Sequence, residues 1–219
     1  NADKLEIGGV DLLINKKKHL SKVRGKIASM VFQDSMTSFD PLFSIGYQIV
    51  ETILTHKNIN KKDAFNESVN LLKKVEIQNP EKVINYYPHQ LSGGMLQRAM
   101  IAMALSCEPK LLIADEPTTA LDVTVQAQIL QLIKDLQIEN NMSLIMITHD
   151  LGVIAETVDR VIVMYGGQIM ENSNVYEIFD NPNHPYTKAL IDSIPGQKPG
   201  KRKLKEITQS ERDSWYASN

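Results

Sequence analysis

Apolar residues follow two different spacings along the chain, and each spacing predicts a type of secondary structure. Short apolar runs that end in polar residues are typical of buried strands. Elsewhere apolar residues recur every three or four positions, which predicts amphipathic helices. The predicted strands occupy residues 27–32, 111–114, 143–148 and 160–165, and the predicted helices occupy much of 45–87, then 95–106, 124–139, 151–157 and 175–179, with a last helix that ends near residue 193.

Strands that alternate with helices after residue 107 indicate an α/β protein with a mostly parallel sheet covered on both faces. A tight hairpin turn is expected at Gly166 and Gly167, and a polar loop is expected from residue 34 to 41. Ligands bind such sheets beyond the carboxyl ends of the strands. Four polar residues stand at those ends, and they are Gln33, Asp115, Glu116 and His149.

A glycine-rich turn precedes the helix predicted at 95–106. It consists of Leu91, Ser92, Gly93, Gly94 and Met95. A helix that starts this way presents unpaired N–H groups and the positive end of its dipole, which suits a phosphate. The same residues are also common as an ordinary cap and turn, so the turn alone indicates nothing about function.

Two consecutive carboxylates, Asp115 and Glu116, end the strand predicted at 111–114. Such a pair suits a Mg²⁺ ion and a base that activates water. Acidic residues are also frequent at helix starts, and a single histidine such as His149 is usually an ordinary polar residue. The prediction therefore depends on the order of all these features along one chain.

Composition narrows the classes of protein. The 219 residues are enough for one domain with an inserted lobe, and the net charge of −2 gives no reason to expect nucleic acid as a partner. The apolar runs are too short to span a bilayer, and the single Cys107 cannot form an internal disulfide. A cytosolic location is expected. Because the chain begins at Asn1 rather than Met, we expect it to be part of a longer protein.

The order of these motifs resembles the nucleotide-binding domain of ATP-binding-cassette (ABC) ATPases. Gln33 resembles the Q-loop, residues 91–95 the signature motif, 111–116 Walker B, 120–122 the D-loop, and His149 the switch histidine. The resemblance implies a P-loop NTPase-like (RecA-like) fold with an inserted helical subdomain. It implies one nucleotide-binding domain over 1–219, with a core sheet subdomain at 1–44 and 107–180, a helical signature subdomain at 45–106 and a C-terminal extension at 181–219.

Three segments, 32–38, 114–126 and 181–187, further resemble the ATPase subunits of oligopeptide, dipeptide and nickel importers. This resemblance implies a subunit that couples ATP hydrolysis to transport at the cytoplasmic face of the membrane. Its implied partners are permease subunits and a second ATPase subunit, identical or different. An ABC protein of DNA repair or translation is a weaker alternative, because the charge is nearly neutral and residues 181–187 are importer-like.

The resemblance also implies roles for individual residues, with ATP and Mg²⁺ as cofactors. Asp115 and Gln33 would hold Mg²⁺, and Glu116 would polarise the attacking water. His149 would contact the γ-phosphate, and Asp122 would link two sites across a dimer. The signature residues Leu91, Ser92, Gly93, Gly94 and Met95 would close over the γ-phosphate held by the other subunit. The segment from Gln33 into the helical lobe would receive a membrane subunit.

The sequence departs from the family pattern at its beginning. The Walker A pattern requires Gly-Lys followed by Ser or Thr, whereas Gly25-Lys26 and Gly200-Lys201 are followed by Ile27 and Arg202. We therefore expect the first strand and the Walker A loop to be missing and this chain alone to be inactive. Losing about three phosphate contacts would weaken ATP binding by on the order of 10³-fold. A non-catalytic or decayed subunit is the alternative.

Overall fold

The structure is a computed structural model that describes residues 4–13, 20 and 23–193. It divides into two compact units, Asn1–Ile147 and Thr148–Asn219, which are described separately below. The lysines at positions 16–18 and the Lys-rich tail at 198–205 lie outside the described residues.

A three-stranded parallel sheet forms the centre of the first unit. Its order is β3 (Ala28–Val31), β4 (Leu111–Asp115) and β5 (Ser143–Ile147). All three strands fall within one residue of the predicted apolar runs. In β4, Leu112 and Ala114 are completely buried, as expected of a central strand whose alternate side chains face the core.

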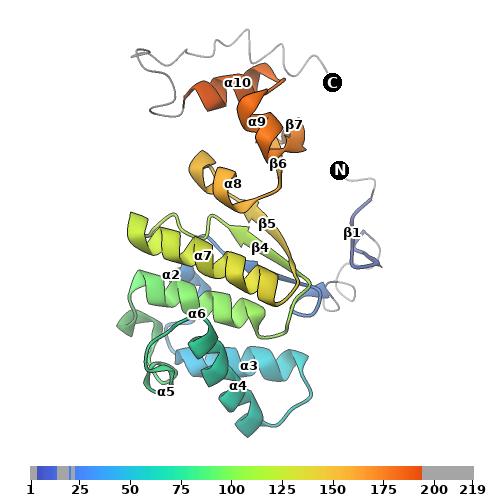
Figure 1. Cartoon of the computed structure of the whole chain (residues 1–219). Helices are drawn as coiled ribbons and strands as arrows, with labels where there is room; N and C mark the ends of the chain where they lie inside the picture. The colour runs from blue at the N-terminus through green and yellow to red at the C-terminus, as the bar shows by residue number, and fades with distance from the viewer. Residues whose placement is uncertain (1–3, 14–19, 21–22, 194–219) are drawn as a thin grey trace. The chain divides into compact units, whose positions relative to one another are not determined.

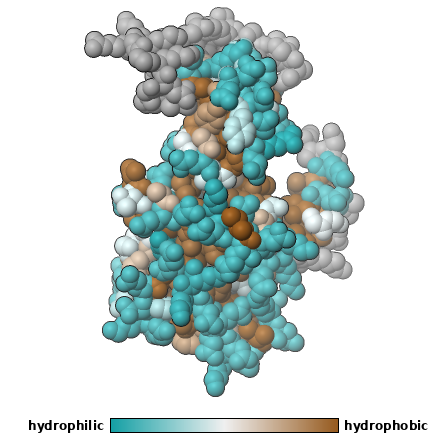
Figure 2. All heavy atoms as spheres, viewed as in Figure 1, coloured by the Kyte–Doolittle hydropathy of each residue, from teal (hydrophilic) through white to brown (hydrophobic). Residues whose placement is uncertain are grey.

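Two long helices pack against this sheet and against each other, and Figure 1 shows them side by side. These are α6 (Gly93–Leu105) and α7 (Val123–Glu139). Helix α6 begins two residues earlier than expected, because Ser92 accepts a hydrogen bond from the N–H of Met95 and so caps Gly93 as the first helical residue. The visible outer face of these helices is mostly hydrophilic with scattered apolar side chains (Figure 2).

The helical lobe predicted at 45–87 is present. It contains α3 (Ile45–His56), α4 (Lys61–Lys74), the short α5 (Pro80–Val83) and the 3₁₀ turn η1 (Pro88–Gln90). Ser44 caps α3, and Asn60 caps α4. Buried residues of α3 and α4, including Ile49, Ile53 and Leu72, share one core with α6. The lobe and the sheet are thus held together by continuous apolar packing.

A short helix and a pair of short strands complete the first unit. Residues 34–41 were expected to be a loop, but they contain α2 (Ser35–Ser38), because the Asp34 carboxylate accepts hydrogen bonds from the N–H groups of Met36 and Thr37. Near the N-terminus, β1 (Glu6–Ile7) and β2 (Val10–Asp11) pair antiparallel.

The second unit contains α8 (Leu151–Thr157), β6 (Arg160–Tyr165), β7 (Gln168–Asn174), α9 (Val175–Asp180) and α10 (Pro185–Asp192). Strands β6 and β7 form the predicted hairpin, with Gly166 and Gly167 at φ of 54° and 82°. In the described part of the chain, β6 pairs only with β7 and not with the parallel sheet. The apolar core of this unit comes from one face of β6 and from the helices that follow.

Candidate functional site

Gln33 and Glu116 meet at the carboxyl edge of the parallel sheet. Strands β3 and β4 are in parallel register, with Val31 opposite Ala114, so the residues that follow them emerge at the same edge. Gln33 Nε2 donates a hydrogen bond of 2.6 Å to Glu116 Oε2 across 83 residues of sequence. The structure therefore brings together Gln33, Asp115 and Glu116, three of the four strand-end residues that the sequence predicts.

The backbone of Glu116 is held in an unusual conformation. Its φ is +43°, in the left-handed region that non-glycine residues seldom adopt. Its N–H donates to the carbonyl of Ile147 at the end of β5 (2.8 Å), and Thr119 Oγ1 donates to its Oε2 (2.8 Å). Four other non-glycine residues within the described ranges, among them Glu108, also have a positive φ, so this conformation alone does not mark a functional site. At Glu116, however, hydrogen bonds fix both the main chain and the side chain.

A cavity of about 390 Å³ opens beside this pair. Gln33 and Asp115 both line it, and the remaining lining comes from Phe32, Asp34, Thr37 and Ser38. A carboxylate and an amide oxygen are suitable ligands for Mg²⁺, which usually takes one or two protein ligands and completes its shell with water and phosphate oxygens. Among the described residues there is no cluster of three acidic, histidine or cysteine side chains. The Asp115 carboxylate and the Gln33 amide oxygen are thus two side-chain groups of this lining that would suit a Mg²⁺ ion.

The glycine-rich turn packs against the start of α7. A Cβ on Gly94 would lie 2.8 Å from Val125 Cγ1, whereas a Cβ on Gly93 would lie an ordinary 3.5 Å from Leu121 Cδ2. Asp122 caps α7 by accepting from the N–H of Val125 (3.0 Å). The starts of α6 and α7 are thus in direct contact, and Gly94 is required for that approach.

The predicted signature residues differ in how far they are exposed to solvent. Leu91 is buried and Met95 packs against the core, while Ser92 and Gly93 are exposed. No residue of the turn lines the cavity next to Gln33. The turn is therefore open toward solvent at Ser92 and Gly93.

His149 lies directly after β5, at the start of the second unit. Thr148 Oγ1 accepts from the N–H of Asp150 (3.0 Å), and the Asp150 carboxylate caps α8 through Gly152 (2.8 Å). The boundary between the units falls between Ile147 and Thr148. The expected place of His149 beside Glu116 therefore stays a prediction.

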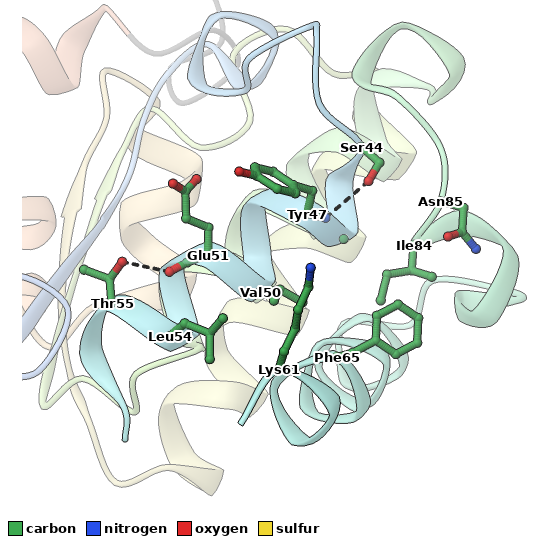
Figure 3. A pocket seen from close by; sticks show the side chains of 11 residues that line it. Ser44, Tyr47, Val50, Glu51, Leu54, Thr55, Lys61, Phe65, Ile84 and Asn85 are labelled. Carbon is green, nitrogen blue, oxygen red and sulfur yellow. Dashed lines mark hydrogen bonds between the residues drawn. The ribbon is translucent and has the colours of Figure 1, made fainter. Parts of the chain in front are cut away.

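A second cavity, of about 490 Å³, lies in the helical lobe between α3, α4 and the turn that follows α5 (Figure 3). Tyr47, Leu54 and Phe65 line it and are 38–47% exposed. The N–H of Gly46 donates to the carbonyl of Ile84 (2.8 Å), which draws the turn onto α3. The sequence pattern does not indicate this cavity, because nothing in it distinguishes the exposed Leu54 from the buried Ile53 that precedes it on α3.

Lys57 forms one ion pair within the helical lobe and a second one with the turn that precedes β4. Lys57 Nζ lies 2.7 Å from Glu67 Oε1 on α4 and 2.8 Å from Glu108 Oε1 in the turn before β4. Partial burial disfavours the charge on Lys57, but the hydrogen bonds to Glu108 and Glu67 outweigh it and raise the pKa of Lys57. The hydrogen bond from Lys57 in turn lowers the pKa of Glu108. These pairs are structural, since neither carboxylate lines a cavity.

In the second unit, the Glu171 carboxylate receives the N–H groups of Asn183 (2.8 Å) and His184 (3.0 Å). Burial disfavours its charge, yet the hydrogen bonds to its oxygens lower the pKa of Glu171. This contact fixes the segment that leads into α10. The contact of Glu171 was not predictable from the sequence, because no residue pattern in β7 distinguishes an inward-facing glutamate from an exposed one.

The fold is that of an ABC ATPase domain, and the chain belongs to the ABC transporter family. Residues 2–119 match the family model described as ABC transporter. Residues 170–215 match the model described as oligopeptide/dipeptide transporter, C-terminal region. The resemblance that the sequence motifs indicate, and the fold class that it implies, are therefore confirmed.

Individual relatives agree with this assignment. The chain is 51% identical to the dipeptide transport ATP-binding protein DppD of Haemophilus influenzae over 94% of its own length, and 55% identical to the oligopeptide transport ATP-binding protein AppD of Bacillus subtilis over 84%. It spans 63% and 56% of these two relatives. None of the described helices is long and apolar enough to cross a membrane.

Two solved structures share this fold. A dimeric post-hydrolysis state of the cassette MJ0796 bound to ADP and Pi matches with a TM-score of 0.69 and 27% identity, over 78% of this chain and 73% of that one. CbiO1 of Clostridium perfringens, part of the transporter complex CbiONQ, matches with a TM-score of 0.66 and 28% identity, over 77% and 65%.

Proposed function

We propose that this protein is the ATP-binding and ATP-hydrolysing subunit of an importer for oligopeptides or dipeptides. The observation that carries the proposal is the hydrogen bond between Gln33 and Glu116, next to Asp115 and a cavity, at the carboxyl edge of the sheet. The relatives support the substrate class, since they are named for dipeptide and oligopeptide transport. The alternative of a decayed, non-catalytic subunit gains no support from them.

The proposed chemistry is hydrolysis of Mg·ATP. Asp115 and Gln33 would hold Mg²⁺, whose charge neutralises the phosphates. Glu116 orients and polarises the attacking water, because its carboxylate is fixed beside the cavity. His149 contacts the γ-phosphate. Ser92 and Gly93 of a second subunit close over the same phosphates, and Asp122 links the two sites.

The proposed partners are permease subunits and a second ATPase subunit, at the cytoplasmic face of the membrane. The dimeric state of the MJ0796 cassette supports the second ATPase subunit. We assign the membrane-facing contact to the helical signature subdomain at 45–106, where Tyr47, Leu54 and Phe65 leave apolar area exposed around a cavity. Residues 1–44 and 107–180 form the core sheet subdomain and 181–219 the C-terminal extension in this proposal.

The test uses the full-length product of the gene, with and without its membrane subunits. Glu116→Gln removes the base and is expected to lower ATP turnover by about 10²–10⁴-fold, which is the usual contribution of a positioned base. Binding of Mg·ATP should be retained. Glu139→Gln is the matched control, because Glu139 is an exposed carboxylate at the end of α7 paired with Lys74. Wild-type turnover by Glu116→Gln would refute the proposal.

A further inference from the structure

Thr119 contacts the proposed catalytic carboxylate directly. It lies in the turn between β4 and α7, three residues after Glu116. Its Oγ1 donates to Glu116 Oε2 at 2.8 Å, and its N–H donates to the Glu116 carbonyl at 3.3 Å. The same Oε2 accepts the 2.6 Å hydrogen bond from Gln33. Oε2 of Glu116 therefore accepts hydrogen bonds from two side chains, one earlier in the sequence (Gln33) and one later (Thr119).

The two donors, Gln33 and Thr119, differ in their other contacts. In the proposed function, Gln33 uses the oxygen of its amide for Mg²⁺ while its nitrogen donates to Glu116. Thr119 does not line the neighbouring cavity, so its hydroxyl serves the carboxylate itself. Thr119 can donate to Glu116 because the positive φ of Glu116 (+43°) turns the chain. The hydroxyl three residues later thereby comes within 2.8 Å of the Glu116 carboxylate.

We infer that Thr119 is the positioning residue for Glu116 in ATP hydrolysis. With Oε2 held by Thr119 and Gln33, the carboxylate cannot rotate without breaking two hydrogen bonds, so its orientation toward water is fixed before the nucleotide arrives. Hydrogen bonds to a charged group are stronger than those between neutral groups. This inference rests on the proposed function and adds a residue to it.

The test compares Thr119→Val, which keeps the shape and removes the donor, with Thr119→Ser, which keeps the donor. In the full-length protein, Thr119→Val is expected to lower kcat about tenfold or more, the effect of losing one charge-assisted hydrogen bond. In Thr119→Val, KM for ATP should change by less than about twofold, because Thr119 does not line the neighbouring cavity. In Thr119→Ser, which keeps the hydroxyl, kcat should be restored to within about threefold of wild type. Thr52→Val is the matched control, because it also removes a hydroxyl bond, to the Gln48 carbonyl (2.9 Å).

A merely structural role is excluded by repeating the substitution without the base. In the Glu116→Gln background, Thr119→Val should cause no further loss of turnover, because the two residues act as a unit. Equal losses in both backgrounds, wild-type kcat in Thr119→Val, a higher kcat, or no recovery in Thr119→Ser would each overturn the inference.

A second readout does not depend on hydrolysis. With ¹³C-labelled glutamate, the side-chain carboxyl signal of Glu116, assigned by its loss in Glu116→Gln, should move in Thr119→Val and stay in place in Thr119→Ser. A signal that does not move would show that the contact is absent and would overturn the inference. If the wild-type protein failed to hydrolyse ATP, the proposed function would fall, and this signal would still decide whether Thr119 holds Glu116.

Discussion

Gln33 Nε2 lies 2.6 Å from Glu116 Oε2, and this hydrogen bond joins the ends of two neighbouring parallel strands. It places an amide that can bind a metal ion against a carboxylate that can orient water. The segment that follows β3 therefore contacts Glu116 directly. In the proposed importer subunit, that segment leads into the helical lobe, so the bond is a short physical connection between the lobe and the site of hydrolysis.

Gln33→Leu should lower ATP turnover by about tenfold or more, because it removes both a donor to Glu116 and an oxygen ligand while keeping a similar volume. Since Gln33 is exposed, the free energy of unfolding should change by less than about 0.5 kcal/mol. Steady-state ATPase assays and urea denaturation check the two expectations. Turnover at the wild-type rate would show that the hydrogen bond has no part in hydrolysis.

Gly94→Ala should destabilise the first unit, because the new Cβ would lie 2.8 Å from Val125 Cγ1. Overpacking of this kind costs about 1–3 kcal/mol, partly offset by about 1 kcal/mol from the better helix propensity of alanine. Gly93→Ala is the control, since its Cβ would lie 3.5 Å from the nearest side-chain atom. Urea denaturation should show a lower midpoint for Gly94→Ala alone.

Val125→Ala in the Gly94→Ala background should recover most of that loss, because it removes the methyl group that meets the new Cβ. If the double variant were as unstable as Gly94→Ala, the packing of the glycine-rich turn on α7 would not explain the requirement for glycine. Coupling between residues in contact typically amounts to about 0.5–3 kcal/mol, which denaturation can resolve.

The site at the sheet edge was predictable because its signals are local. The apolar runs before Gln33 and Asp115 fix where the strands end, and parallel pairing brings those ends together. Thr119 was not predictable as a contact of Glu116, because the contact depends on a left-handed conformation at a glutamate. Nothing in a glutamate side chain favours that conformation, which is stabilised by the N–H bond from Glu116 to Ile147 across the sheet.

Long-range contacts also explain the parts of the fold that the sequence did not indicate. The cavity in the helical lobe depends on the bond from Gly46 to Ile84, 38 residues apart, and helix periodicity carries no information about such a pair. Local capping signals were missed at α2, where Asp34 caps a four-residue helix inside an expected loop, and at α6, which begins two residues earlier than expected after its serine cap. The hairpin at Gly166 and Gly167 was correctly predicted, because two adjacent glycines suit the positive φ of such a turn.

Glu171 should make the second unit less stable in acid. Its pKa is lowered in the folded state from an ordinary value of 4.5, so its contribution is present above pH 4.5 and is lost as the pH falls through the folded-state pKa. Glu171→Gln leaves one acceptor oxygen for two N–H donors and should cost about 1–3 kcal/mol at neutral pH. Amide exchange in α10 is the measurement, since the segment entering that helix depends on the carboxylate.

Glu177→Gln is the control for this effect, because Glu177 is exposed on α9. In the Glu171→Gln variant, protection of the α10 amides should be lower at pH 7 and should change less between pH 7 and pH 4 than in the wild-type protein. Equal pH dependence in the two proteins would mean that another group is responsible.

Phe65→Asp should weaken association with the membrane subunits. Phe65 is 42% exposed and lines the cavity between α3 and α4, so a carboxylate there would place a charge in the proposed apolar contact. Removing a central aromatic anchor from an interface commonly costs about 2 kcal/mol or more, which corresponds to a loss of affinity of about 30-fold. Co-purification and titration with the membrane subunits measure this loss.

Tyr176→Asp is the matched control, because Tyr176 is an aromatic residue on α9 that is 76% exposed and lies in the other unit. Phe65→Asp should leave the basal ATPase rate of the protein without its membrane subunits within about twofold of wild type, since the change is confined to the lobe surface, where substitutions have small effects on stability. Only the increase in ATPase rate that the membrane subunits cause should become smaller. If association were unchanged in Phe65→Asp, the cavity would not be the membrane-subunit contact, and the exposed apolar area of α3 and α4 would need another partner.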